Sequence, residues 1–255
     1  MKHSEAIVDQ FTRQAAQFAA SPTARSEEIL ERMLRLAQPS SSDTALDVAC
    51  GPGVLACAMA RYVRHARGID LTPAMLEQAR RTQQEQGVGN IVWDQGDVTA
   101  MPYADAQFDI VTCRFAVHHF PEPLRVLGEM RRVCRPGGRI VIADSAPAAS
   151  KADAFNAMEK LRDPSHTRAL AVEEMTELFV QAGLPRPQVE RMRLALDLDE
   201  FLSRSYPNAG DEARIRRMFE DALTDDAMDL QPRREGAKIC FSVPVGIYAV
   251  QVPSA

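Results

Sequence analysis

Residues 45–56 read Ala-Leu-Asp-Val-Ala-Cys-Gly-Pro-Gly-Val-Leu-Ala, and they decide how the rest of the chain is interpreted. The first half is apolar enough for a short buried strand, and the glycines predict a tight turn that opens a helix. Asp47 interrupts the strand four residues before Gly51. Because a buried carboxylate is costly unless its charge is compensated, we expect a cationic ligand group beside it. The alternative is a core carboxylate that accepts hydrogen bonds from neighbouring backbone amides.

From this stretch to about residue 145, strand-like and helix-like segments alternate. The expected strands are residues 45–50, 67–71, 91–93, 108–113 and 139–144. The alternation predicts an α/β fold with a mostly parallel sheet and helices on both faces. Right-handed crossovers bring the carboxyl ends of the strands to one edge, where ligands bind in folds of this class.

The chain on either side of this alternation has a different pattern. Residues 4–20 and 26–36 carry apolar residues at helical spacing, so we expect residues 1–42 to form a helical extension over an edge of the sheet. Residues 43–149 are the expected ligand-binding core. Residues 150–255 are expected to supply helices on the substrate side, a helical cap and the last strands. Pro244 and Gly246 interrupt the final expected strand, 238–252, and predict that it lies at an edge or carries a bulge.

The glycine turn by itself does not identify its ligand. Gly51, Gly53 and Ala56 match the G-x-G-x-x-G/A pattern of dinucleotide-binding turns, and Asp70 follows at the distance at which such proteins bind a ribose. A nicotinamide-dependent oxidoreductase is therefore one interpretation. Pro52 argues against it, because proline removes a backbone N–H from the turn and weakens a pyrophosphate site.

Acidic residues at three successive strand ends favour a different ligand. Asp47, Asp70 and Asp97 are expected to meet at one edge of the sheet. This set suits a ligand with a positive head and a neutral nucleoside, as in S-adenosylmethionine. In this hypothesis Asp47 holds the α-ammonium, and Asp70 accepts from both ribose hydroxyls. Asp97 accepts from the adenine amino group, and Val98 packs beside the ring.

Five stretches also carry a resemblance to a known family, in that family's order and spacing: residues 46–53, 68–75, 96–103, 108–120 and 129–142. The chain resembles class I S-adenosylmethionine-dependent methyltransferases, and within them the ubiquinone/menaquinone-biosynthesis-like branch (methyltransferase type 11). The resemblance implies a Rossmann-like sheet of seven strands with a reversed last strand. It also implies further cofactor-binding positions at Ala49, Cys50, Leu71, Met75, Gly96 and Arg114. Pro52 is a departure, because the family more often has Thr or Ser there.

Three histidines are candidate catalytic bases. His118 and His119 follow the fourth expected strand, where the family has residues that face substrate and cofactor, and His166 lies on the expected substrate side. Histidine is suited to deprotonating an acceptor hydroxyl or nitrogen near neutral pH. The alternatives are structural: one histidine of the pair bonds backbone in the turn while the other is exposed, and His166 has a capping or turn role. Phe11 and Phe18 are candidates to close over the cofactor, although aromatic residues at helical spacing are more often core.

Composition narrows the class of partner. The net charge of −5 argues against a general nucleic-acid binder. The five cysteines lack the paired spacing of a disulfide framework or a zinc site, so we expect no metal and a reducing, cytoplasmic compartment. No apolar run is long enough for a membrane span, and the first residues do not read as a signal peptide.

We therefore expect an enzyme that transfers a methyl group from S-adenosylmethionine to oxygen, nitrogen or carbon of a small, apolar or aromatic acceptor, as a monomer or homodimer. The alternatives are a related S-adenosylmethionine-binding protein without catalysis, and a nucleic-acid or protein methyltransferase. Residues 150–235 are expected to line the acceptor site, but no motif there identifies the acceptor.

Overall fold

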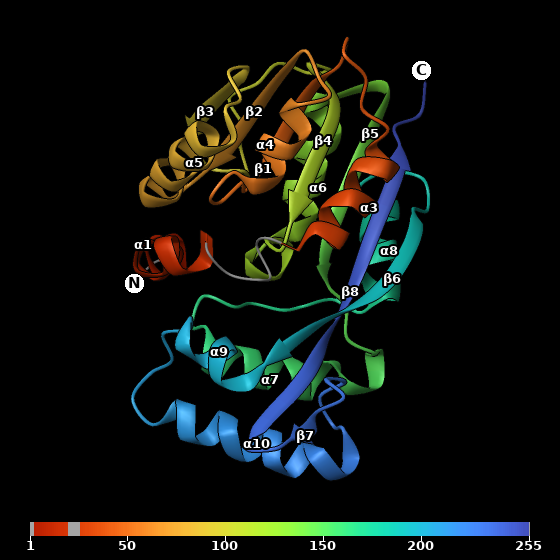
Figure 1. Cartoon of the computed structure of the whole chain (residues 1–255). Helices are drawn as coiled ribbons and strands as arrows, with labels where there is room; N and C mark the ends of the chain where they lie inside the picture. Colours follow the sequence, from red (N-terminus) through yellow and green to blue (C-terminus); the bar gives the residue numbers. More distant parts are fainter. Residues whose placement is uncertain (1–2, 20–25, 255) are drawn as a thin grey trace.

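The computed structural model describes residues 3–19 and 26–254, which form two lobes joined by long strands (Figure 1). The strands are β1 (Thr44–Val48), β2 (His65–Asp70), β3 (Ile91–Gln95), β4 (Phe108–Arg114), β5 (Cys134–Ser145), β6 (Gln188–Asp197), β7 (Arg233–Glu235) and β8 (Lys238–Gln251). The helices are α1 (His3–Ala19), α3 (Glu27–Ala37), α4 (Val54–Ala60), α5 (Pro73–Gln86), α6 (Pro123–Val133), α7 (Ala152–Arg162), α8 (Val172–Gln181), α9 (Leu198–Ser203) and α10 (Asp211–Asp225). A 3₁₀ turn, η1 (Val117–His119), follows β4.

The strands form one sheet in the order β3-β2-β1-β4-β5-β8-β6, with the short β7 paired to β8. Each neighbouring pair from β3 to β5 is parallel, whereas β8 runs antiparallel to both β5 and β6. The α/β class and the mostly parallel, Rossmann-like sheet with a reversed last strand are confirmed. Because β1, β2 and β4 run in the same direction, their carboxyl ends meet at one edge.

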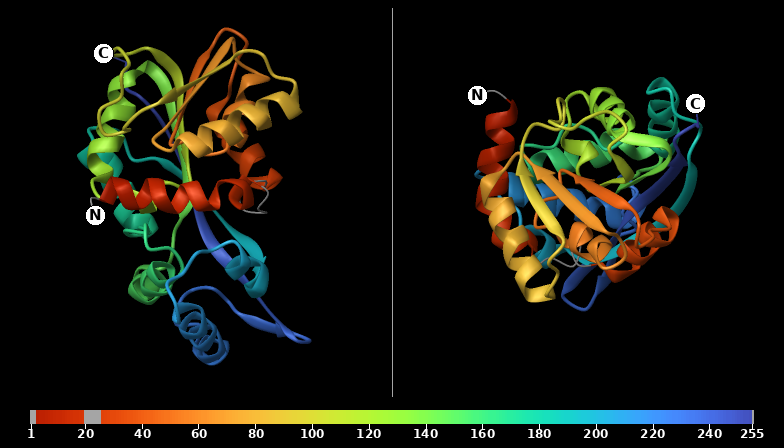
Figure 2. Two further views of the ribbon diagram at one scale, coloured as in Figure 1. Left: turned by 90° about the vertical axis from the view of Figure 1, so that its left-hand side faces the viewer. Right: turned by 90° about the horizontal axis from the view of Figure 1, so that it is seen from above.

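Helices cover both faces of this sheet (Figure 2). One face carries α3 and α4, whose buried Ile29, Met33 and Leu55 pack with Ile110 and Val141 of the sheet. The other carries α6 and α8. The expectation that both N-terminal helices pack over an edge is wrong for α3, because its wide apolar stripe is buried on the sheet face. Figure 2 shows α1 crossing the junction between the lobes.

The second lobe is built on the far ends of β6 and β8, which extend beyond β5 (Figure 1). We call it the cap lobe; it consists of these strand ends with α7, α9, α10 and β7. It has a core of its own, in which Phe219 and Phe241 meet edge to face with ring centroids 4.8 Å apart. The two strands therefore connect two hydrophobic cores without a break in the backbone.

The expectation of an edge or bulged final strand is wrong. β8 lies between β5 and β6, and its pairing with β6 is continuous from Cys240 to Ala249. Pro244 is tolerated because it stands one residue beyond Val245, which forms the last pair with β5, so that its missing N–H removes no ladder bond to that strand. At Gly246 a Cβ atom would lie 2.4 Å from the hydroxyl of Tyr248, so the glycine makes room for that ring.

Candidate active site

The glycine turn between β1 and α4 is shaped by the ring of Trp93 on β3. Gly53 has a φ of +75°, and a Cβ atom there would lie 2.5 Å from that ring. On β2, a Cβ atom at Gly68 would also lie 2.5 Å from it. Glycine is thus required at Gly53 both by the left-handed backbone and by the close approach of the indole. The packing fixes the backbone of the turn against the sheet.

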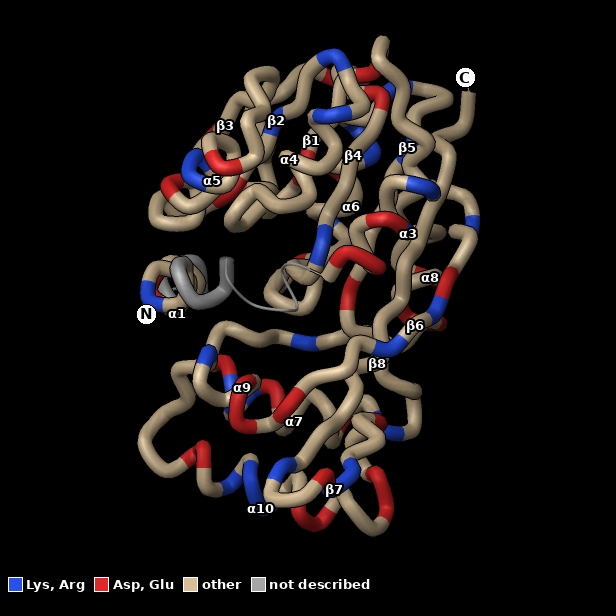
Figure 3. Tube along the Cα trace, in the orientation of Figure 1, with Lys and Arg blue, Asp and Glu red and all other residues tan. Residues whose placement is uncertain are grey.

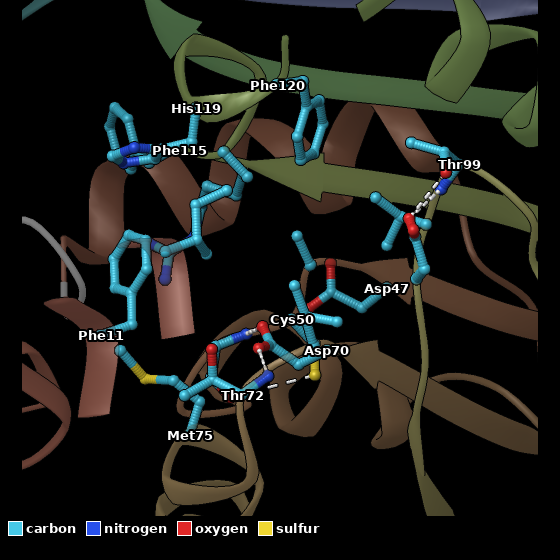
Figure 4. Close-up of a pocket in the computed structure, with 18 of the residues that line it drawn as sticks. Phe11, Asp47, Cys50, Asp70, Thr72, Met75, Thr99, Phe115, His119 and Phe120 are labelled. Carbon is cyan, nitrogen blue, oxygen red and sulfur yellow. Dashed lines mark hydrogen bonds between the residues drawn. The ribbon is translucent and has the colours of Figure 1, made fainter. Parts of the chain in front are cut away.

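A cavity of about 330 Å³ opens beside this turn at the carboxyl ends of β1, β2 and β4 (Figure 4). We call it the cofactor cavity. Ten of the predicted cofactor-binding residues line it: Asp47, Ala49, Cys50, Gly51, Asp70, Leu71, Met75, Asp97, Val98 and Arg114. The other two lie behind it. Gly53 is the N-cap residue just before α4. Gly96 packs against Ile69, and its N–H donates to the carbonyl of Asp70 (3.1 Å).

Local hydrogen bonds fix the carboxylate of Asp70. One oxygen accepts from the N–H of Gly51 and the other from the N–H of Thr72, both at 2.8 Å. Asp70 thereby ties the glycine turn to the first turn of α5. Asp97 is exposed and differently held, because its Oδ1 accepts from both the N–H and the hydroxyl of Thr99.

The carboxylate of Asp47 is the least compensated of the three. It is 4 % exposed, and its Oδ1 accepts from the hydroxyl of Thr112 at 2.9 Å. Burial raises the pKa of Asp47 to about 7, although Thr112, the cation of Arg114 and the N–H of Ala56 act in the opposite direction. Burial also lowers the pKa of Arg114 to about 10, which leaves it cationic at neutral pH. Asp47 is therefore a buried carboxylate with a hydrogen bond from the protein, as in the core-carboxylate alternative. Its raised pKa shows that an added cation would still stabilise the charged form.

These residues fit S-adenosylmethionine. Asp47 and Asp70 present carboxylates toward the same cavity, the Gly51 backbone lines it, and Leu71, Met75 and Val98 give it an apolar wall. The opposite end is aromatic. Figure 4 shows Phe115, His119 and Phe120 facing the end that holds Asp47 and Asp70.

Sequence reasoning missed most of the aromatic end. Phe11 lines the cofactor cavity, so the idea that it closes over the cofactor fits its position, whereas the side chain of Phe18 lies outside the described residues. Phe115 also lines the cavity, although no sequence pattern singles it out. It has a φ of +51°, which is uncommon outside glycine. Ala49, at the end of β1, has the same φ, so strained backbone flanks the cavity on two strands.

His119 is the histidine that faces the cofactor cavity, and polar groups behind it set its tautomer. Its Nδ1 lies 3.1 Å from the hydroxyl of Ser165, and that hydroxyl donates to Asp163 at 2.6 Å. Because the serine proton is committed to Asp163, Nδ1 of His119 donates to Ser165 and Nε2 carries the lone pair. Burial, with the neighbouring His118, lowers the pKa of His119 well below its usual value, so the ring is neutral at pH 7.

His118 and His166 are held differently. His118 Nδ1 lies 2.5 Å from a carboxylate oxygen of Asp144; burial lowers its pKa, but Asp144 outweighs burial and the net shift is upward. His166 is 1 % exposed, lines neither cavity, and its Nε2 is 2.7 Å from the carbonyl oxygen of Asn156. A base must reach the proton it removes. The structure therefore does not bring His166 to either cavity, and its ring lies behind His118 with the two ring centroids 5.4 Å apart.

A second, smaller cavity of about 100 Å³ lies between the sheet lobe and the cap lobe. We call it the inter-lobe cavity. It shares Phe11, Phe115 and His119 with the cofactor cavity, and His118 lines it as well. Its remaining walls come from α1, α7, β6, α9 and β8 and from Ser145 and Asp163. Residues between 159 and 204 supply part of this wall.

The fold and the cofactor cavity are those of an α/β protein that binds a nucleoside-containing ligand. Comparison with known proteins identifies the family to which the chain belongs. A family described as "Methyltransferase domain" matches residues 46–142. The chain is 32% identical to an uncharacterized methyltransferase, YcgJ of Bacillus subtilis, over 86% of this chain and 87% of that protein. The crystal structure of YcgJ superposes with a TM-score of 0.82 at 28% identity, covering 89% of this chain and 99% of the other.

A further relative is the ubiquinone/menaquinone biosynthesis C-methyltransferase UbiE of Roseobacter denitrificans, which is 28% identical over 74% of each chain. The chain belongs to the methyltransferase family, and it is an S-adenosylmethionine-dependent enzyme of that family. Among the helices of the described part of the chain, none is both long and apolar enough to cross a membrane.

Proposed function

We propose that this enzyme transfers a methyl group to a small acceptor held in the inter-lobe cavity. One observation carries the proposal: the inter-lobe cavity and the cofactor cavity share Phe11, Phe115 and His119. Methyl transfer needs the acceptor atom in line with the methyl carbon and its leaving group. An acceptor in the inter-lobe cavity would approach the cofactor between these three side chains, and their two phenyl rings would exclude water there.

The cofactor supplies an already activated methyl group when bound, so the protein contributes binding, alignment and proton transfer. In this proposal Asp47 stabilises the ammonium of the methionine part. Asp70, already positioned by two backbone N–H groups, accepts from the ribose hydroxyls through its remaining lone pairs. Asp97 and Val98 hold the adenine. The three acids come from the ends of three adjacent strands, which supports a ligand that spans β1, β2 and β3.

His119 accepts the proton of the acceptor at Nε2. Its low pKa does not prevent this, because an oxygen that begins to bond to the methyl carbon becomes far more acidic, and a weakly basic imidazole then suffices. The transferred proton makes the His119 ring cationic, and Asp163 stabilises that charge through the hydroxyl of Ser165. Burial opposes the charge of Asp163, but Arg162 and the two hydrogen bonds from Ser165 help to keep its pKa below the usual value.

A small acceptor fits the surface better than a nucleic acid does. Lys and Arg are interspersed with Asp and Glu over the described trace of both lobes (Figure 3), and the net charge is −5. Nucleic-acid binders need a concentrated basic surface. UbiE, by its name, acts in quinone biosynthesis, and a small aromatic acceptor is consistent with the aromatic entrance formed by Phe11 and Phe115. A cytoplasmic location is part of the proposal, because all five cysteines are free.

Calorimetry and product detection test the proposal together. We expect the wild type to bind S-adenosylmethionine, and Asp70→Ala to bind it about 100-fold more weakly, because two charge-assisted hydrogen bonds are lost. Incubation with a panel of small phenols, hydroquinones and amines should release S-adenosylhomocysteine. The exposed Asp153→Ala on α7 is the control. Equal binding by Asp70→Ala would contradict the cofactor site, and binding without any methylated product would favour the non-catalytic alternative.

A further inference from the structure

His118 presents a ring nitrogen to the inter-lobe cavity. Its Nδ1 lies 2.5 Å from a carboxylate oxygen of Asp144, which is 1 % exposed and so lies behind the wall. The side chain of His118 lines the cavity and is 11 % exposed. No described residue bonds its Nε2, and that atom is not sealed from solvent, in contrast to the buried Nδ1 of His166. Nε2 of His118 is therefore a point at which the protein can bind a ligand in this cavity.

The backbone of His118 is fixed from both sides. Before it, the N–H of Val117 donates to the second carboxylate oxygen of Asp144 at 2.8 Å. After it, the carbonyl of His118 accepts from the N–H groups of Thr167 and Arg168 at 2.8 and 3.1 Å. The hydroxyl of Thr167 donates to the same carbonyl at 2.7 Å. The position of Nε2 is thus set before any ligand binds.

The surroundings of Asp144 make His118 a hydrogen-bond donor. A buried carboxylate needs a compensating cation, and within the described chain the ion-pair partner of Asp144 is His118. Burial lowers the pKa of His118, but Asp144 outweighs burial and the net shift is upward. The ring centroid of His119 lies only 4.2 Å away, and the neighbouring cation favours the neutral form of that ring. The two histidines therefore offer opposite functions, an Nε2–H donor at His118 and an Nε2 lone pair at His119.

The wall beside this pair is largely apolar. Leu194, Leu196 and Val243 come from the strands that join the lobes, and Phe201 comes from α9. Phe201 meets Phe241 edge to face, with ring centroids 5.1 Å apart, so the cap core sets its orientation. This surface suits a flat apolar ring.

We propose that the methyl acceptor carries two oxygen atoms on adjacent carbons of an apolar ring, as a catechol or its monoether does. Its hydroxyl group donates to Nε2 of His119 and receives the methyl group, and the neighbouring oxygen accepts from Nε2–H of His118. The assignment rests on the proposed function, because it takes His119 as the base and the inter-lobe cavity as the acceptor site. It makes His118 a specificity-determining residue.

Two neighbouring oxygens fit this pair better than one. The reacting oxygen must direct a lone pair at the methyl carbon, and a hydrogen bond from a cation would withdraw electron density from it. His118 therefore serves an oxygen that does not react, and because the two rings are so close, that oxygen lies next to the reacting one. The hydroxyl oxygen bonds to the methyl carbon, the bond from that carbon to sulfur breaks with its electron pair on sulfur, and the hydroxyl proton goes to His119.

Four ligands with the same ring separate the possibilities: catechol, its monomethyl ether guaiacol, resorcinol and phenol. Catechol and guaiacol place a second oxygen beside the hydroxyl, resorcinol places it one carbon further away, and phenol has none. Their dissociation constants are measured by ligand-observed NMR on the wild-type enzyme saturated with S-adenosylhomocysteine. We expect catechol and guaiacol to bind at least about 10-fold more tightly than the other two, the gain of one hydrogen bond from a charged donor.

His118→Asn tests the donor. The asparagine amide can reach the position of Nδ1 and keep the bond to Asp144, but nothing replaces Nε2. The preference for catechol and guaiacol over phenol should fall to within about twofold, while phenol keeps its wild-type constant. His65→Asn, at an exposed histidine that begins β2, is the matched control and should change none of the four constants. His118→Asn/Asp144→Asn removes the carboxylate charge that has lost its cation, and it serves if the single variant is unstable in thermal denaturation.

The pH dependence distinguishes a donor from a structural support. The titratable and charged groups around the His118 ring are Asp144 of β5, Glu159 and Arg162 of α7, His119 of η1 and His166, with Asp163 and Arg204 also in the wall of the cavity. Because the pKa of His118 is raised above 6.5, its cation is present at pH 6 and is lost as pH rises through the raised value.

Neutral His118 keeps its Nδ1–H toward Asp144, so its Nε2 becomes an acceptor. Guaiacol, whose ether oxygen can only accept, should then lose its advantage over phenol, whereas catechol should keep one through its second O–H. The titration of His118 is followed from its ring proton signals in the same samples.

The outcomes separate this inference from the function on which it rests. Equal affinities for the four ligands, or detectable binding by none, overturn the inference while cofactor binding by calorimetry stands. A preference that survives in His118→Asn, or a guaiacol advantage that persists after His118 has titrated, also overturns it. A loss of phenol binding in His118→Asn as large as that of guaiacol would assign the bond to the reacting oxygen and overturn the two-oxygen acceptor. If the wild type binds no S-adenosylhomocysteine, the proposed function itself fails.

Discussion

The cofactor cavity and the inter-lobe cavity adjoin each other, yet they are built in opposite ways. The acids of the cofactor cavity stand at the ends of β1 and β2 and just beyond β3, and their hydrogen-bond partners lie on the same or an adjacent strand end or turn. The inter-lobe cavity is assembled from α1, η1, the segment around Asp163, α9 and both long strands. The first is a product of sheet topology and the second of lobe packing. Substitutions of residues that line only one of the two cavities should therefore leave the ligand of the other largely unaffected.

Gly53→Ala should produce the largest effect on cofactor binding. The added methyl meets Trp93 at 2.5 Å and occupies a left-handed conformation. Overpacking costs about 1–3 kcal/mol and the conformation about 1–2 kcal/mol. Because this strain is relieved by displacing the turn that lines the cofactor cavity, the dissociation constant of S-adenosylmethionine should rise at least about 30-fold. Calorimetry measures it.

Gly87→Ala is the matched control for this experiment. Gly87 ends α5 with a φ of +64°, and a Cβ atom there meets nothing within 4 Å. It should lower the free energy of unfolding by about 1 kcal/mol and leave cofactor affinity unchanged. Similar losses of affinity in the two variants would mean that backbone strain alone, without Trp93, explains the result.

His119→Gln should affect the chemical step. Removing a general base lowers kcat about 100-fold or more, while S-adenosylmethionine affinity should change little. The rate is measured as S-adenosylhomocysteine release with an acceptor that the wild type consumes. His166→Gln, which retains a group able to reach Asn156, should stay within about threefold of wild type, because that ring faces neither cavity. A larger loss in His166→Gln than in His119→Gln would reverse the assignment of the base.

The smallest effect concerns pH. Burial raises the pKa of Asp47 to about 7, above its unfolded value of 3.8. This group therefore makes the cofactor-free protein less stable as pH rises from about 4 to 7, since the unfolded chain binds fewer protons in that window. A cationic ligand favours the charged carboxylate, so affinity for S-adenosylmethionine should fall as pH drops below 7, by at most about tenfold per unit.

Calorimetry in two buffers of different ionisation enthalpy measures the proton released on cofactor binding at pH 6. Arg114 faces the same carboxylate and stays cationic in this range, because burial lowers its pKa only to about 10. Burial also raises the pKa of Asp70, so Asp47→Asn and Asp70→Asn are compared, and Asp47→Asn should abolish the proton release. Release that persists in Asp47→Asn would locate the titrating group elsewhere.

Sequence reasoning reached the cofactor cavity because each of its contributions is local. An acidic residue at the end of an expected strand can be recognised in the sequence. In a parallel sheet the carboxyl ends of the strands lie at one edge, so the place where these acids meet can be predicted. No local pattern predicts the hydrogen-bonded chain from His119 through Ser165 to Asp163. Ser165 lies 46 residues from His119 in the sequence, and the two meet only because η1 packs against the segment that follows α7.

The position of β8 in the sheet also depends on tertiary packing that a local sequence pattern does not contain. Pro244 and Gly246 are poor strand residues by composition, and the sequence favours an edge. The structure accommodates both through their surroundings, as the neighbouring strand ends beside Pro244 and the Tyr248 ring fills the space above Gly246. Such compensation depends on partners more than 90 residues away or on one specific rotamer, neither of which a local pattern contains.

Trp93 is the only tryptophan of the chain, and it lies beneath the glycine turn with its indole N–H bonded to Gln83 at 2.7 Å. All of the protein's tryptophan fluorescence therefore originates from a ring that packs against the glycine turn beside the cofactor cavity. We expect emission intensity to report occupancy of this site without a label and without knowledge of the acceptor. The residue that forces glycine into the turn is also a built-in optical reporter of it.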